Sequence, residues 1–210
     1  YPEIRFSEFT DAWEQRKLEE IVVRSSSICF DTNLPRVEYD DIEPGEGKLN
    51  KDIYDKKSIK SGIAFREGDV LYGKLRPYLQ NWLLPSFAGV AVGDFWVLQP
   101  QKIDSSFLYR LIQSREFDEV ANQSSGTKMP RADWNLVSKT EFFIPSNIYE
   151  QVAIASYFTI IDDLITLHQR KYELLKKIKK ALLEKMFPKN GEKYPEIRFS
   201  EFTDAWEQRK

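Results

Sequence analysis

The chain has 210 residues, of which 41% are apolar and 14% aromatic, and this is enough for one or two globular domains with a buried core. The net charge of −2 gives no general attraction for nucleic acid, and the single cysteine excludes an internal disulfide. Because we find no run of about 18 apolar residues and no apolar signal region at the start, we expect a cytoplasmic protein with no membrane partner.

One segment of the sequence occurs twice. The letters YPEIRFSEFTDAWEQRK form residues 1–17 and return as residues 194–210. An identical repeat of this length indicates one structural unit followed by the first stretch of another. If the apolar side chains of the first copy dock into a groove, those of the second copy need the same groove. The side chains concerned are Ile4, Phe6, Phe9 and Trp13, with Ile197, Phe199, Phe202 and Trp206 as their equivalents.

Residues 18–103 have the pattern of short strands and turns. Two strands are expected around the turn at 67–69, and two more around Gly93 and Asp94. From Asp104 the apolar spacing becomes helical, which predicts one helix over 104–123 with Asp104 or Ser105 as its N-cap. A loop at 124–131 and a short strand ending at Pro145 follow.

The longest predicted element is a helix over residues 148–188, which no Gly or Pro interrupts before Pro188. Asn147 is its expected N-cap, with Glu150 placed for a capping box. Apolar residues in alternating steps of four and three form a coiled-coil seam that needs a second helix to cover it. His168 is interpreted as a tolerated seam residue. The expected dimer contacts are Phe158, Ile161, Ile165, His168, Tyr172, Leu175 and Leu182.

Searches for catalytic patterns fail. The GEGK stretch at 45–48 lacks the glycine and the Ser/Thr of a phosphate-binding loop. Asp41 with the Glu46-Gly47-Lys48 triplet resembles a nuclease site but is better explained by a turn, and no Cys/His cluster suits zinc. We therefore expect no catalytic residue, no metal and no cofactor, and a binding or scaffolding role.

Several stretches are distinctive when taken in order. They are GDVLYGKLRPYLQN, GDFWVLQP, SSGTKMPRADWNLVSKTEFFIP and the helix from EQVAIASYF to LLEKMF. Over residues 60–187 this series resembles the specificity subunit of type I restriction–modification systems. The resemblance implies recognition domains that each bind one half of a split site in double-stranded DNA. It also implies an antiparallel pair of spacer helices, with methylation and cleavage carried out by partner methyltransferase and restriction subunits.

The resemblance gives an α+β fold class: a mixed α/β target-recognition domain and a long coiled-coil helix that pairs antiparallel with a second copy. The expected domains are residues 1–147 for recognition, 148–188 for the spacer helix, and 189–210 for a linker with the second repeat. We expect a half subunit that forms a homodimer through the long helix. A stand-alone DNA-binding coiled-coil adaptor and an uncharacterised DNA-modifying enzyme remain as alternatives.

Two local clusters are candidates for DNA contact. Lys74 and Arg76 would share one face of a strand, and the 124–131 loop offers hydroxyls, a glycine and two cations for phosphates. The candidate DNA-binding residues are Lys74, Arg76, Tyr78, Ser125, Gly126, Thr127, Lys128 and Arg131. Base reading stays open among Asn33, Arg36, Tyr39, Lys56, Lys57, Gln80 and Asn81.

Overall fold

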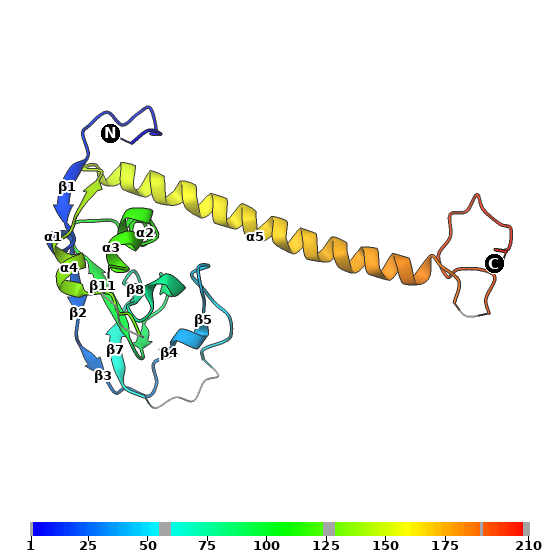
Figure 1. Cartoon of the computed structure of the whole chain (residues 1–210), viewed down its shortest axis with the longest axis horizontal. Helices are drawn as coiled ribbons and strands as arrows, with labels where there is room; N and C mark the ends of the chain where they lie inside the picture. Colours follow the sequence, from blue (N-terminus) through cyan, green and yellow to red (C-terminus); the bar gives the residue numbers. More distant parts are fainter. Residues whose placement is uncertain (1, 55–59, 124–128, 190, 208–210) are drawn as a thin grey trace. The chain divides into compact units, whose positions relative to one another are not determined.

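A computed structural model describes residues 2–54, 60–123, 129–189 and 191–207 (Figure 1). The chain divides into two units, Tyr1–Phe158 and Thr159–Lys210. The first unit holds all of the strands and the four short α-helices. The second unit holds most of the long helix α5 (Ile148–Lys185) and the second copy of the repeat.

An antiparallel four-stranded sheet lies at the centre of the first unit. Its order is β2-β11-β8-β9. Because side chains alternate across a strand, Tyr72 and Leu98 enter one buried cluster while Leu71 and Val97 enter another. The sheet is therefore covered on both faces. Its strands are β2 (Val22–Ser25), β11 (Phe95–Pro100), β8 (Val70–Gly73) and β9 (Trp82–Leu83).

A second four-stranded sheet contributes to one of these clusters. Val37, Phe65 and Ala91 from this sheet join Leu71 and Val97 of the central sheet. The order is β3-β7-β10-β4, and β10 and β4 pair in parallel. The strands are β3 (Ile28–Cys29), β7 (Gly62–Phe65), β10 (Gly89–Ala91) and β4 (Arg36–Val37).

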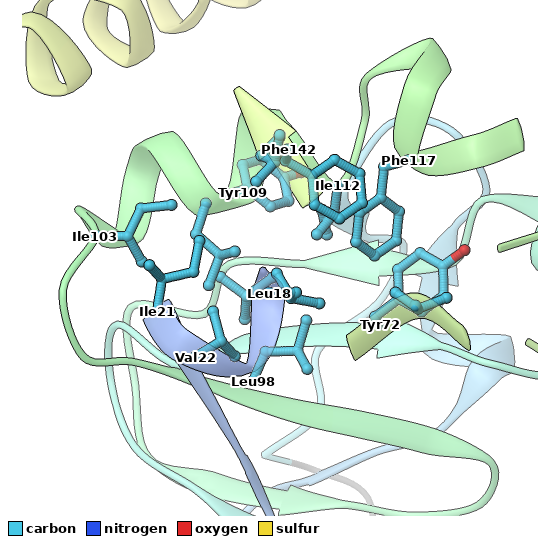
Figure 2. Packing of buried hydrophobic residues seen from close by; sticks show 14 of the residues in the cluster. Leu18, Ile21, Val22, Tyr72, Leu98, Ile103, Tyr109, Ile112, Phe117 and Phe142 are labelled. Carbon is cyan, nitrogen blue, oxygen red and sulfur yellow. The ribbon is translucent and has the colours of Figure 1, made fainter. Parts of the chain in front are cut away.

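The short helices supply the other cluster. Ile112 at the end of α2 and Phe117 in α3 pack with Leu18 and Tyr72 (Figure 2). The helices are α1 (Leu18–Ile21), α2 (Ser105–Leu111), α3 (Arg115–Ala121) and α4 (Trp134–Lys139). Two small antiparallel pairs complete the unit: β1 (Glu14–Lys17) with β12 (Glu141–Ile144), and β5 (Ile42–Glu43) with β6 (Lys48–Leu49).

Most of the predicted elements are confirmed. The turn between β7 and β8 contains Gly68 at φ +85°, and the turn between β10 and β11 contains Gly93 at φ +102°. Asp104 caps α2, since its Oδ1 accepts a hydrogen bond from the Phe107 amide at 2.9 Å. The prediction of one helix over 104–123 is wrong, because Ser114 ends the first helix and its hydroxyl caps a new one. The short helices α1 and α4 were not predicted.

Helix α5 begins where the sequence predicts. The Asn147 side-chain oxygen accepts a hydrogen bond from the Tyr149 amide at 2.9 Å, and the helix continues to Lys185, close to the predicted end. Its 38 residues span about 57 Å at the usual helical rise. No helix in the described part of the chain has the length and apolarity that a membrane span requires.

The two copies of the repeat share one local conformation. The Phe9 amide donates to the Phe6 carbonyl at 3.2 Å, and the equivalent Phe202 amide donates to the Phe199 carbonyl at 3.1 Å. In this chain the two copies line different grooves. The first copy lines a groove with the first turns of α5, and the second lines another with its last turns.

Candidate nucleic-acid interface

The segment after β8 forms a tight loop rather than a continued strand. Arg76 and Gln80 have left-handed backbones, with φ of 50° and 56°, and flank a single turn of 3-10 helix, η2 (Pro77–Leu79). The expected strand face shared by Lys74 and Arg76 is therefore wrong, since β8 already ends at Gly73. Left-handed non-glycine residues persist only where their surroundings hold them, and such residues concentrate at functional sites.

Close backbone approach holds this loop in place. The Gly73 amide donates to the Asn81 carbonyl at 2.7 Å, and a Cβ on Gly73 would lie 2.8 Å from that same oxygen. The Gln80 carbonyl accepts from the Gly45 amide at 3.1 Å. Pro77 is buried beneath the loop, whereas Tyr78 is 56% exposed. The loop thus presents an exposed aromatic ring on a fixed backbone.

A second segment, distant in the sequence, joins this loop. Arg131 forms an isolated antiparallel bridge with Leu75. The Arg76 amide donates to the Pro130 carbonyl at 2.8 Å, and the Ala132 amide donates to the Lys74 carbonyl at 2.8 Å. Lys74, Arg76, Tyr78 and Arg131 therefore lie on two strands of chain that hydrogen bonds hold side by side. We call these four residues the basic cluster.

Asp94 lies between two members of the basic cluster. Its Oδ1 is 3.5 Å from Lys74 Nζ, and its Oδ2 is 3.1 Å from an Arg131 guanidinium nitrogen. All three side chains keep access to solvent, with relative exposures of 29% for Asp94, 32% for Lys74 and 53% for Arg131. The pairs are thus open to exchange with ions from solution.

Tyr39 fixes the backbone at the same place. Its hydroxyl donates to the Asp94 carbonyl at 2.6 Å and accepts from the Leu75 amide at 3.1 Å. Its ring stacks on Phe95 with 4.6 Å between centroids. Burial raises the pKa of the Tyr39 phenol, so the hydroxyl stays protonated and remains a donor. Tyr39 therefore organises the loop, and its hydroxyl is already used.

The structure separates the other candidates for base reading. Arg36 is only 2% exposed, and its guanidinium donates to the carbonyls of Lys60, Leu34 and Asp31. Its side chain is therefore not accessible to a DNA base, and its place among the base-reading candidates is wrong. Asn81 is also buried, at 5% exposure. Asn33 is exposed and Gln80 is half-buried. The predicted contacts Ser125, Gly126, Thr127 and Lys128, and also Lys56 and Lys57, lie outside the described residues.

The acidic turn that resembles a nuclease site has a structural role. Asp41 is fully buried, accepts a hydrogen bond from the Glu38 amide at 2.7 Å, and pairs with Lys51 at 2.9 Å. Within the described ranges, no group of three or more His, Cys, Asp or Glu side chains could hold a metal ion.

Helix α5 presents a second candidate surface. Of its residues only Glu150, Gln151 and Ala155 are buried. Ile161 is partly exposed and His168 is exposed. The other predicted seam residues carry large exposed apolar surfaces: Phe158 46%, Ile165 48%, Tyr172 61%, Leu175 53% and Leu182 38%. Apolar exposure on this scale along one helix is typical of a binding surface.

Sequence reasoning missed Asp94 and the bridging role of Tyr39. Asp94 was predicted only as part of a turn, and its sequence separation from Lys74 and Arg131 hides the pairing. The signal that could have found Asp94 is its place after Gly93, in the turn between β10 and β11. Since Phe95 of β11 pairs with Gly73, the last residue of β8, this turn brings the Asp94 side chain close to Lys74.

Comparisons with known proteins bear on this arrangement. A family model described as the type I restriction modification DNA specificity domain matches residues 10–177. The specificity subunit of the type I restriction enzyme MjaVIII from Methanocaldococcus jannaschii is 26% identical over 197 residues, which cover 84% of this chain and 45% of that protein. The specificity subunit of EcoDI from Escherichia coli is 34% identical over 125 residues, covering 57% and 28%.

Solved structures share the fold. An HsdS subunit from Thermoanaerobacter tengcongensis superimposes with a TM-score of 0.65 at 20% sequence identity, covering 88% of this chain and 52% of that one. The chain thus spans about half of that structure, and less than half of the length of the two curated relatives.

Proposed function

This chain belongs to the type I restriction modification DNA specificity family, and from that premise we propose that it recognises one half of a split double-stranded DNA site. The family favours this function over a stand-alone coiled-coil adaptor or a DNA-modifying enzyme. In this proposal the chain contributes recognition only. Methylation and cleavage belong to methyltransferase and restriction subunits that dock on it.

The observation that carries the proposal is the basic cluster. The net charge of the chain is −2, so phosphate binding depends on a local concentration of cations. Lys74, Arg76 and Arg131 come from two segments that backbone hydrogen bonds join, which brings three cationic residues to one part of the surface. Such a local group of cations suits the closely spaced phosphates of a duplex.

We assign the cations to phosphate contacts and leave base reading to neighbouring groups. Phosphate contacts fix the register of a protein on the duplex but carry no sequence information. The exposed Tyr78 ring and the half-buried Gln80 side chain belong to the same loop as Arg76. An amide side chain can bind an adenine edge in the major groove. Gln80 is therefore our first candidate for a base contact.

The test is a salt titration of DNA binding. Replacing the exposed Arg76 by Gln should weaken binding to every duplex and reduce the slope of log K against log salt by about 0.9, the value for one lost phosphate contact. Lys102→Gln, at an exposed cation outside the basic cluster, is the matched control and should leave the slope unchanged. An unchanged slope in the folded Arg76→Gln variant would place the DNA surface elsewhere.

The division of labour between subunits has a separate test. Duplex DNA incubated with the chain alone should remain unmodified, whereas addition of a type I methyltransferase subunit should produce methylated adenines at a defined site. Mapping of these adenines gives the recognised sequence. Modification or cleavage by the pure chain alone would revive the enzyme alternative.

We further propose that α5 pairs antiparallel with the α5 of a second copy. The exposed seam supports this, because each fully buried side chain of this size contributes about 1.5–3 kcal/mol. Two identical recognition domains related by a two-fold axis would bind the same half-site on opposite strands, so the site should be symmetric. Leu175→Lys should produce a monomer in sedimentation experiments, and Gln169→Lys, an exposed position outside the seam, should not.

A further inference from the structure

The Asp94 carboxylate contacts two of the three cations in the basic cluster. It contacts Lys74 at 3.5 Å and Arg131 at 3.1 Å, one oxygen to each cation. A DNA phosphodiester presents the same chemistry, a single negative charge shared by two exposed oxygens. Two cations at these distances form a binding site for one anion. In the free protein this site is occupied by the Asp94 carboxylate.

The fold of the loop does not depend on this carboxylate. The Asp94 main chain makes the connections: its carbonyl accepts from the Lys74 amide at 2.9 Å and from the Tyr39 hydroxyl at 2.6 Å. The Lys74 carbonyl and the Arg76 amide are bonded to the 130–132 segment. A neutral side chain at position 94 leaves all of these hydrogen bonds in place. The charge of Asp94 is therefore separable from its structural role.

We propose that Asp94 is a phosphate substitute, which holds Lys74 and Arg131 in their DNA-binding positions and must give them up when a DNA phosphate binds. The inference rests on the proposed DNA recognition. It has an energetic consequence, because the incoming phosphate displaces an intramolecular carboxylate instead of a mobile counterion. Binding to any duplex through these cations alone is weakened by that exchange. Asp94 thus lowers the affinity for non-specific DNA, because a duplex that makes no base contacts has nothing to offset the exchange.

The experiment is Asp94→Asn, with binding to a short random-sequence duplex measured by fluorescence anisotropy between about 50 and 200 mM salt. The variant should bind this duplex about tenfold more tightly near 0.1 M salt, and its salt slope should steepen by up to about 1.8, because two more DNA phosphates lose their condensed counterions to the freed cations. Glu67→Gln removes one exposed negative charge at the β7–β8 turn and is the matched control for net charge. It should change neither quantity appreciably.

A second comparison isolates the two cations. Lys74→Ala should have little effect on random-duplex binding in the wild-type background, where Asp94 occupies the cation, and a clear effect in the Asp94→Asn background. If Asp94→Asn melts well below the wild type, Asp94→Ser gives the same removal of charge with a smaller side chain and the same main chain.

The outcomes separate the two proposals. Tighter binding and a steeper slope in the folded variant support the role of Asp94. Unchanged or weaker binding, with wild-type protein that does bind DNA, overturns that role and leaves DNA recognition intact. If neither the wild type nor the variant binds any duplex, the proposed function fails together with the inference.

Discussion

The arginine of the repeated segment offers a test within one chain, because it occurs twice in the same sequence context. Arg5 forms a bidentate pair with Glu150, with Nε–Oε1 at 2.6 Å and Nη2–Oε2 at 2.7 Å, and Trp13 donates to the same carboxylate at 3.0 Å. In the second copy, Nη1 of Arg198 is buried without a hydrogen-bond partner among the described residues. Replacing each arginine by Ala should therefore have unequal effects.

The magnitude follows from burial. Glu150 is 1% exposed and Arg5 is 12% exposed. Removing one partner of a buried pair costs about 3–5 kcal/mol, because the other charge stays buried and uncompensated. Since water can reach the space that Arg5 leaves, we expect the lower end, about 3 kcal/mol, for Arg5→Ala. This corresponds to a fall in melting temperature of about 6–12 °C for a unit of this size. Arg198→Ala should stay within about 0.5 kcal/mol of the wild type.

The assay is urea unfolding followed by tryptophan fluorescence. Four of the five tryptophans, at positions 13, 82, 96 and 134, lie in the first unit, and the fifth, Trp206, contacts Phe187 in the second, so fluorescence reports both units. Arg198→Ala is the matched control, since the two substitutions remove the same side chain from the same local sequence. Equal losses of stability in the two variants would refute the reasoning that Glu150 distinguishes the copies.

Three further results are expected. Hydrogen bonds from Arg5 hold the pKa of Glu150 below its ordinary value. This pair therefore stabilises the fold above about pH 4.3, and the stabilisation is lost as the pH falls through the lowered pKa. The difference in stability between the wild type and Arg5→Ala, measured by thermal melts, should shrink in acid. Tyr39→Phe removes a hydroxyl that bridges the Leu75 amide and the Asp94 carbonyl, and should cost about 1–3 kcal/mol in urea unfolding while weakening DNA binding. Gly47→Ala should destabilise the first unit, because its Cβ would overlap the Tyr109 hydroxyl at a φ of +62°; a melting temperature equal to that of the wild type would contradict this contact.

Local signals predicted the strands beside two glycine turns, the strand before Pro145 and the long helix, but not the other short strands. Strands β7 and β8 were predicted on either side of the turn that contains Gly68, and β10 and β11 on either side of Gly93. The start of α5 followed from Asn147 as a cap. The break at Ser114 was missed although the sequence signals it: no apolar residue occupies 113–116, and a serine three residues before Phe117 is a capping signal. Helix α4 is only six residues long, and periodicity is weak over so short a stretch.

The candidate site was predictable in its residues but not in its arrangement. The spacing of Lys74, Arg76 and Tyr78 and the cation at Arg131 were visible in the sequence. Their proximity depends on backbone bonds between segments that lie more than fifty residues apart, and composition carries no signal for such bonds. The left-handed backbone at Arg76 was equally hidden, because the residue type does not require it and the surrounding bonds impose it.

The repeat shows how far sequence identity determines structure. Both copies fold into the same turn, so the turn is a local property of the sequence and does not require Glu150. The contacts differ: Arg5 meets a buried carboxylate, whereas the second copy packs against the last turns of α5, where Phe187 and Trp206 make an edge-to-face contact. Phe199 and Phe202 remain 64% and 59% exposed there. The second copy thus keeps the turn but leaves these rings exposed and Nη1 of Arg198 without a hydrogen-bond partner among the described residues. The glutamate at the start of α5 therefore distinguishes the surroundings of the two copies.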